Sequence, residues 1–123
     1  MDKISTLLKV EFEGLPPTVN QMYRTGSRGQ RYKKPEVADW QEEVSAKIKE
    51  TWSNSLPSEG EVLVSVIFTV STKRRWDIDN RLKALFDCLQ SVGVIKDDSQ
   101  ISGIMAGKTD GDRDCTSLEV REY

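Results

Sequence analysis

The stretch RRWDIDNRLKALFDCLQSVGVIKDDSQ, residues 74–100, combines dense charge with a regular apolar pattern. The pattern predicts an amphipathic α-helix that begins near Asp79, because its apolar residues recur at the spacing of one helical face. Gly93 follows the last apolar turn and is typical of a helix C-terminus. The residues of the buried face are Leu82, Leu85, Phe86 and Leu89.

The sequence around this helix predicts an α+β fold. Residues 61–70 are rich in β-branched side chains and predict a central strand, and residues 6–12 alternate well enough for a first strand. Pro35 and the apolar spacing behind it predict a helix over residues 35–52. Two short strands are expected near 100–106 and 115–121, with a turn over 108–114 between them and a loop over 24–34. We therefore expect one two-layer domain over residues 1–123, a mixed β-sheet with two main helices in the order β-α-β-α-β-β.

Composition narrows the chemistry that the chain can perform. It has 123 residues and no histidine, which excludes histidine-dependent nucleophilic catalysis and ordinary zinc sites of cysteine and histidine. The two cysteines, Cys88 and Cys115, are too few for a disulfide framework and are expected to be free thiols. The first residues lack the pattern of a signal peptide and no apolar run could span a bilayer, so we expect a cytoplasmic protein, in a bacterial or phage-infected cell.

Aspartates gather on both sides of the predicted helix. Asp77 and Asp79 stand at its start, and Asp97 and Asp98 follow it about twenty residues later. Crowded carboxylates repel one another, and Mg²⁺ is the kind of hard cation that prefers such oxygen ligands. An Asp-x-Asp pair is a weak signal by itself, because acidic side chains also stabilise a helix N-terminus through its dipole. We expect Asp98 to reach the other two if the helix and the next strand fold back alongside each other.

A second group of aspartates, DGDRD at residues 110–114, begins like a calcium-binding loop. Cys115 stands where that loop requires glycine, and Arg121 stands where it requires a bidentate glutamate. We therefore interpret this group as a turn between strands.

Positive charge is concentrated in two stretches although the chain has a net charge of −2. Residues 24–34 hold five arginines and lysines and no acid, and residues 73–75 hold three more. Basic residues concentrated in this way favour the binding of a polyanion, although two solvated basic loops would produce the same pattern.

Two blocks of the sequence resemble the RusA-type Holliday-junction resolvases, small endodeoxyribonucleases of bacteria and their phages. The first block is LPPTVNQMYR, residues 15–24, and is similar to the Pro-Pro, Asn and Tyr-Arg segment of that family. The second is residues 74–101, which resembles the family's Asp-x-Asp-Asn, Lys, Phe-Asp-x-Leu and Asp-Asp pattern. Trp76 departs from the family, which often has a basic residue before the first aspartate.

The resemblance implies a RusA-like fold and a role for each matching residue. Asp77, Asp79 and Asp98 correspond to the metal-binding catalytic acids, and Lys83 corresponds to the catalytic lysine. The implied cofactor is Mg²⁺, with Mn²⁺ as a substitute. The implied partners are a four-way DNA junction and a second copy of the chain, in DNA recombination and repair. Together with the basic stretches, it predicts DNA contacts from Asn20, Tyr23, Arg24, Arg28, Arg31, Lys33, Lys34, Lys73, Arg74 and Arg75.

Three alternatives remain at this point. A junction-binding protein with weak or no cleavage is one, since Trp76 alters the site. A nucleotide-sugar transferase also uses Asp-x-Asp, but 123 residues leave little room for its nucleotide-binding domain. Lys83 has a structural interpretation too, as a surface partner of Asp79 and Asp87, one helical turn away on either side.

Overall fold

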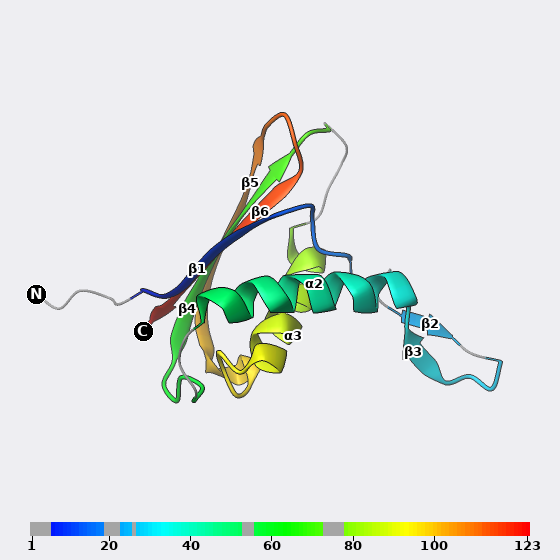
Figure 1. The fold of residues 1–123 in the computed structure, drawn as a ribbon, viewed down its shortest axis with the longest axis horizontal. Coiled ribbons are helices and arrows are strands. Elements are labelled where there is room, and N and C mark those ends of the chain that lie inside the picture. Colours follow the sequence, from blue (N-terminus) through cyan, green and yellow to red (C-terminus); the bar gives the residue numbers. More distant parts are fainter. Residues whose placement is uncertain (1–5, 19–22, 26, 53–55, 73–77) are drawn as a thin grey trace, which may run out of the picture.

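The computed structural model describes residues 6–18, 23–25, 27–52, 56–72 and 78–123. A four-stranded sheet, two α-helices and a small hairpin make up this part of the chain (Figure 1). The strands of the sheet are β1 (Thr6–Glu13), β4 (Val62–Val70), β5 (Ile101–Asp110) and β6 (Cys115–Glu122). The helices are α2 (Pro35–Thr51) and α3 (Leu82–Val92), and two short 3₁₀ helices are η1 (Asp79–Arg81) and η2 (Asp98–Gln100).

The sheet is mixed, with the strand order β1-β6-β4-β5. The central strand β4 pairs antiparallel with β6 and parallel with β5, while β1 pairs antiparallel with β6. A parallel pair needs a crossover, and η1, α3 and η2 supply it between β4 and β5. This arrangement confirms the predicted α+β class, with one mixed sheet and two main helices.

Both helices cover the same face of the sheet, as Figure 1 shows. Every second residue of β4, from Val62 to Val70, is buried against them, as expected for a strand with one face on the core. From α3, Leu85 and Leu89 are fully buried in the same core. Trp52 is buried as well, and the ring of Trp40 meets that of Phe12 edge to face at 6.2 Å. Trp52 therefore belongs to the core, and the partly buried Trp40 packs against it.

The predicted ends of α3 agree closely with the structure. The 3₁₀ turn η1 begins at Asp79 and leads directly into α3. Gly93 ends α3 in the left-handed conformation, with φ of 91°, and its N–H donates to the carbonyl oxygens of Leu89 and Gln90. A side chain at this position would oppose that backbone conformation, so glycine explains the sharp stop.

Two local predictions were wrong. Residues 24–34 do not form a simple loop, because β2 (Tyr23–Thr25) and β3 (Arg31–Lys33) pair antiparallel as a hairpin. Figure 1 shows this hairpin projecting from the N-terminal end of α2, away from the sheet. The turn predicted over 108–114 is shorter as well, since β5 continues its pairing with β4 as far as Asp110.

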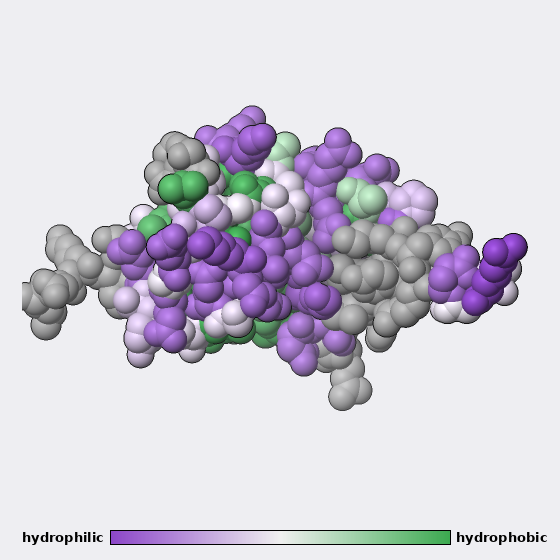
Figure 2. Space-filling view, turned by 90° about the horizontal axis from the view of Figure 1, so that it is seen from below, coloured by the Kyte–Doolittle hydropathy of each residue, from purple (hydrophilic) through white to green (hydrophobic). Residues whose placement is uncertain are grey.

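The free thiols and the hydrophilic surface agree with the composition. Cys88 is buried, Cys115 is partly buried, and neither is in a disulfide. On the face that Figure 2 shows, the described residues are mostly hydrophilic, with hydrophobic residues in separate small areas. Within the described ranges, no helix combines the length and the apolar character needed to cross a bilayer.

Candidate active site

The start of α3 carries two of the predicted catalytic side chains. Asp79 is exposed and opens η1, and Lys83 follows one turn later on the polar side of the helix. The Lys83 ammonium lies 3.3 Å from Oδ1 of Asp87, one turn further along. About half of the Lys83 side chain, 48%, remains exposed, so the ammonium is accessible to a ligand in solution. Asp77 lies outside the described residues.

Asp98 lies at the other end of α3. It opens η2, the short turn after α3 that leads into β5, and it is exposed. Because α3 has 11 residues, its two ends are separated by about 16 Å. The chain does turn back after Gly93, but it returns to the start of β4, since Ile101 pairs with Val62. Folding back therefore does not bring Asp98 to Asp79 within one chain.

The turn that holds Asp98 is fixed by a set of hydrogen bonds. Asp97 and Gln100 form a reciprocal capping box, and Ser99 Oγ donates to Asp97 Oδ2 at 2.7 Å. This bond lowers the pKa of the Asp97 carboxyl below its ordinary value. The Gln100 amide also donates to the carbonyl oxygens of Ser58 and Gly60, at 2.7 and 2.9 Å. These bonds tie η2 to the segment before β4.

The donor set suits a hard cation, although the described part of one chain does not assemble a complete site. Carboxylate oxygens at Asp79 and Asp98 are ligands that Mg²⁺ prefers. Among the residues with described positions, no three carboxylate or thiol side chains lie close enough together to hold a metal ion. Asp77 is not among those residues, and it stands two positions before Asp79 in the sequence.

Arg81 connects the two sequence blocks at the start of α3. Its Nη1 donates to the carbonyl oxygen of Pro16 at 2.6 Å, across 65 positions in the chain. Partial burial lowers the pKa of its guanidinium and the nearby Asp114 carboxylate raises it, yet an arginine keeps its charge throughout the physiological range. Arg81 was not predicted as a site residue, although its place between Asp79 and Lys83 was a signal that could have found it.

A cavity of about 370 Å³ opens beside Arg81. Residues from the segment after β1, from the first turn of α2 and from η1 line this cavity. The base of the hairpin therefore lies close to η1. The cavity lining includes two cationic residues, Lys34 and Arg81, and one acidic residue, Glu36. The lining residues are Leu15, Pro17, Lys34, Glu36, Val37, Trp40 and Arg81.

The Asp114 carboxylate, between β5 and β6, binds the segment that follows β4. Oδ1 of Asp114 accepts hydrogen bonds from the backbone N–H and the hydroxyl of Ser71, both at 2.8 Å. These bonds, with a smaller contribution from the positive charge of Arg81, lower the pKa of Asp114 below its ordinary value. Ser71 directly follows β4, so these hydrogen bonds fix the chain at the point where it leaves β4.

The basic stretch 24–34 forms most of the projecting hairpin. Arg24 pairs with Tyr32, Tyr23 with Lys33, and Thr25 with Arg31 through the backbone. Arg28 is exposed in the turn, and Lys34 is half-buried at the start of α2. Of the other predicted DNA-contacting residues, Asn20, Lys73, Arg74 and Arg75 lie outside the described residues.

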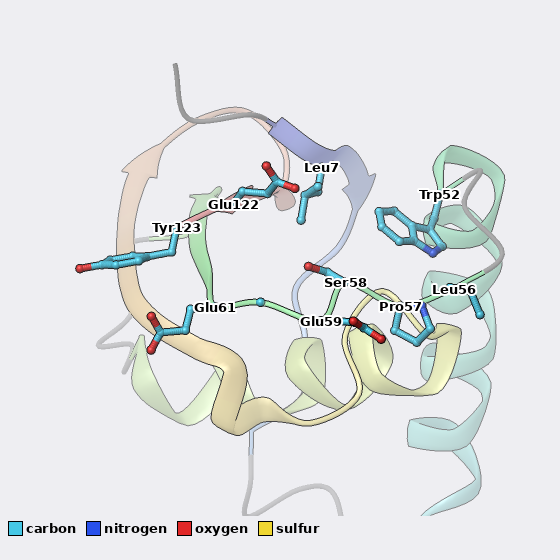
Figure 3. A pocket seen from close by; sticks show the side chains of 10 residues that line it. Leu7, Trp52, Leu56, Pro57, Ser58, Glu59, Glu61, Glu122 and Tyr123 are labelled. Atoms are coloured by element: carbon cyan, nitrogen blue, oxygen red, sulfur yellow. The ribbon is translucent and has the colours of Figure 1, made fainter. Parts of the chain in front are cut away.

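A larger cavity, of about 510 Å³, lies at the opposite end of the sheet (Figure 3). Leu7, Trp52 and Tyr123 contribute apolar surface to it, and Figure 3 shows Glu59, Glu61 and Glu122 around it. The described residues that line it include three glutamates and no lysine or arginine, and Lys96 pairs with one of these glutamates, Glu59, at 3.5 Å. The acidic side chains make this cavity less suited to a phosphate than the start of α3.

The fold and the polar end of α3 therefore define a small α+β protein that presents carboxylate, ammonium and guanidinium groups beside a basic hairpin. This chemistry is typical of enzymes that act on the phosphodiester backbone of nucleic acids.

Comparison with known proteins gives the family. A family model described as "Endodeoxyribonuclease RusA" matches residues 13–121. A curated protein of Aquifex aeolicus (strain VF5), "Crossover junction endodeoxyribonuclease RusA", is 30% identical over 87 residues, which cover 71% of this chain and 68% of that protein. The chain belongs to the RusA family of Holliday-junction endodeoxyribonucleases.

Proposed function

We propose that the chain is a Mg²⁺-dependent resolvase that cuts four-way DNA junctions by paired symmetric nicks, in DNA recombination and repair. The observation that carries the proposal is that Asp79 and Lys83 lie one helical turn apart at the start of α3, inside the span that matches the family. The whole chain, residues 1–123, would act as one RusA-like domain. Each nick would leave a 5′-phosphate and a 3′-hydroxyl.

In this proposal Asp77, Asp79 and Asp98 hold the metal, for which Mn²⁺ would be a substitute. When bound, Mg²⁺ would polarise the phosphodiester and lower the pKa of a bound water. The acids would orient the ion, and the ammonium of Lys83 would offset the charge that develops on the phosphate. The exposed position of Lys83 leaves room for such a contact.

The separation of Asp79 and Asp98 bears on the oligomeric state. Ligands of one Mg²⁺ ion lie about 2.1 Å from it, so two side chains at opposite ends of an 11-residue helix do not share an ion. We infer that Asp98 of a second chain completes the site, and that the enzyme acts as a homodimer. A two-fold symmetric dimer also presents two equivalent sites to the two equivalent strands of a junction.

The basic hairpin and the residues near it would bind phosphates. Lysine and arginine contacts to phosphate supply affinity and salt dependence, and carry little sequence information. Arg28 and Lys34, with the side chains of Tyr23, Arg24, Arg31 and Lys33, would contribute from the hairpin. Asn20, Lys73, Arg74 and Arg75 would contribute as well.

The test is incubation of the chain with an end-labelled synthetic four-way junction, with Mg²⁺ or with EDTA, and with linear duplex of the same sequence as the control. We expect symmetric nicks in the junction with Mg²⁺, none with EDTA, and little cutting of the duplex. Extension of the products by a polymerase without prior treatment checks the 3′-hydroxyl. Tight junction binding with no cleavage in Mg²⁺ or Mn²⁺ would instead support the junction-binding alternative.

A further inference from the structure

Segments that are far apart in the sequence meet at one end of the sheet. At this end Glu13 of β1 pairs with Cys115 of β6, and Val70 of β4 pairs with Asp110 of β5. The ends of β1 and β4 therefore lie beside the turn that connects β5 to β6. The chain leaves the sheet here for η1 and α3, since both follow β4 in the sequence.

The turn between β5 and β6 packs closely against the end of β4. The N–H of Gly111 donates to the carbonyl oxygen of Val70 at 3.1 Å. A Cβ atom at position 111 would collide with the Cγ2 methyl group of Thr69, so glycine allows this close approach. Asp114, three positions later in the same turn, is thereby held beside the end of β4.

Asp114 binds the chain just beyond the ends of two strands. Its Oδ1 accepts hydrogen bonds from the backbone N–H and the hydroxyl of Ser71, which directly follows β4, both at 2.8 Å. Its backbone carbonyl oxygen accepts from the N–H of Gly14, which directly follows β1, at 2.8 Å. The hydroxyl of the buried Thr116 donates in turn to the carbonyl oxygen of Gly14 at 2.9 Å. One residue thus ties together the points at which β1 and β4 end.

Arg81 makes the corresponding connection from η1. Its Nη1 donates to the carbonyl oxygen of Pro16 at 2.6 Å, and its backbone N–H donates to the carbonyl oxygen of Ile78 at 3.1 Å, which closes the 3₁₀ turn. Pro16 stands two positions after Gly14, in the segment that Asp114 holds. The opposite charges of Arg81 and Asp114 also attract each other. Asp114 is therefore connected to η1 both through the segment after β1 and through charge.

The chain that connects β4 to η1 is held at both of its ends. It begins at Ser71, which Asp114 binds, and it ends at η1, which Arg81 ties to the segment after β1. In the sequence Asp79 and Lys83 each stand two positions from Arg81. A shift of η1 would therefore move both of the side chains to which the proposed function assigns chemistry.

We propose that Asp114 is a positioning residue, which with Arg81 holds η1 at a fixed place relative to the end of β4. The proposal rests on the proposed function, because the side chains that it positions are Asp79 and Lys83. The role requires no contact between Asp114 and the metal or the DNA. It requires only that η1 keeps its place, because a misplacement of about 1 Å can slow an enzyme by about 100-fold.

The first test follows the connection itself and needs no activity. Amide hydrogen exchange of the full chain, measured by NMR without metal or DNA, reports the N–H groups of Ser71 and Arg81 separately. Asp114→Asn keeps an acceptor oxygen for Ser71 and removes the charge that attracts Arg81. In this variant we expect the Arg81 amide to exchange at least about threefold faster, the ordinary effect of a partly exposed charge pair, while the Ser71 amide changes little. Asp112→Asn, exposed in the same turn, is the matched control and should leave both amides unchanged.

The second test separates positioning from DNA binding and from stability. We would measure the rate of junction nicking at saturating Mg²⁺ with enzyme in excess, and the dissociation constant for the junction in EDTA by mobility shift. For Asp114→Ala we expect the rate to fall by about 10–100-fold while the dissociation constant stays as in the wild type. Asp114→Asn, which keeps the bonds to Ser71, should lose less. Val120→Ala shortens a fully buried side chain further along β6 and is the stability control, so it should keep the wild-type rate below its own unfolding temperature.

A double variant shows whether Asp114 and Arg81 act together. Arg81→Gln removes the charge that Asp114 attracts and weakens the bond to Pro16. If both residues hold the same turn, Asp114→Ala with Arg81→Gln should nick about as slowly as the slower single variant, because the second change removes little that is still in place. Two effects that multiply would mean that the residues act independently, which contradicts the proposal.

The outcomes separate this proposal from the proposed function. An Arg81 amide that exchanges at the wild-type rate in both Asp114→Asn and Asp114→Ala overturns it, as does full nicking activity of Asp114→Ala. If Asp114→Ala fails to fold, as judged by circular dichroism, Asp114→Asn replaces it in both tests. A wild-type chain that does not nick junctions refutes the resolvase, and the exchange measurement then still decides whether Asp114 holds η1.

Discussion

Replacement of Lys83 by alanine separates the catalytic and the structural roles of this side chain. Its ammonium lies 3.3 Å from Asp87, and the two side chains are 48% and 24% exposed. An exposed pair one helical turn apart stabilises a protein by only about 0.3–0.5 kcal/mol. For a domain of this size, that loss lowers the melting temperature by only about 1–3 °C.

The catalytic role predicts a much larger effect on rate. If the ammonium offsets charge on the phosphate in the transition state, its loss should slow cleavage by about 10²–10³. We would measure the first-order rate of nicking of a labelled junction, with enzyme and Mg²⁺ in excess so that binding does not limit the rate. Lys83→Arg keeps the charge but changes its reach and shape, so it should recover only part of the activity.

Asp87→Asn supplies the matched control. It removes the same ion pair and leaves the ammonium in place, so the stability change should equal that of Lys83→Ala while cleavage stays close to wild type. If Lys83→Ala cuts the junction at the wild-type rate, the catalytic role is wrong. If both variants lose activity together, the ion pair positions the helix and Lys83 has no separate function.

Three further predictions concern other parts of the molecule. Asp79→Asn should abolish cleavage and keep junction binding in a mobility-shift assay; near wild-type cutting would remove Asp79 from the site. Neutral replacements of Arg28, Arg31 and Lys33 should flatten the plot of log K against log [salt] by roughly 0.9 for each phosphate that is no longer neutralised, and an unchanged slope would make the hairpin a solvated surface. Asp114→Ala should lower the free energy of unfolding at pH 7, as measured with urea. Because the folded pKa of Asp114 lies below its unfolded value, this difference should shrink as the pH falls below about 4, and a constant difference would refute the assigned hydrogen bonds.

The helices and the long strands could be predicted from the local pattern of apolar and polar residues in the sequence. The apolar spacing from Leu82 to Leu89 and the stop at Gly93 are properties of adjacent residues, and so is the alternation along β4. The hairpin 23–33 was missed because its strands have three residues each and polar side chains, so they carry no apolar alternation. The capping box of Asp97 and Gln100 has a recognisable acid-x-x-Gln spacing, but it was not predicted because the aspartates were interpreted only as metal ligands.

The distance between Asp79 and Asp98 shows where local pattern stops being informative. Both residues flank the same helix, and sequence spacing alone allows the chain to bring them together. Their positions depend instead on the direction of the next strand: β5 runs parallel to β4, so it must begin at the same end of the sheet as β4 and far from the start of α3. A crossover connection thus separates two side chains that a hairpin connection would have joined. If both acids bind one metal ion, they must come from two different chains. The surface that joins the two chains is then required to form the active site, just as the carboxylates are.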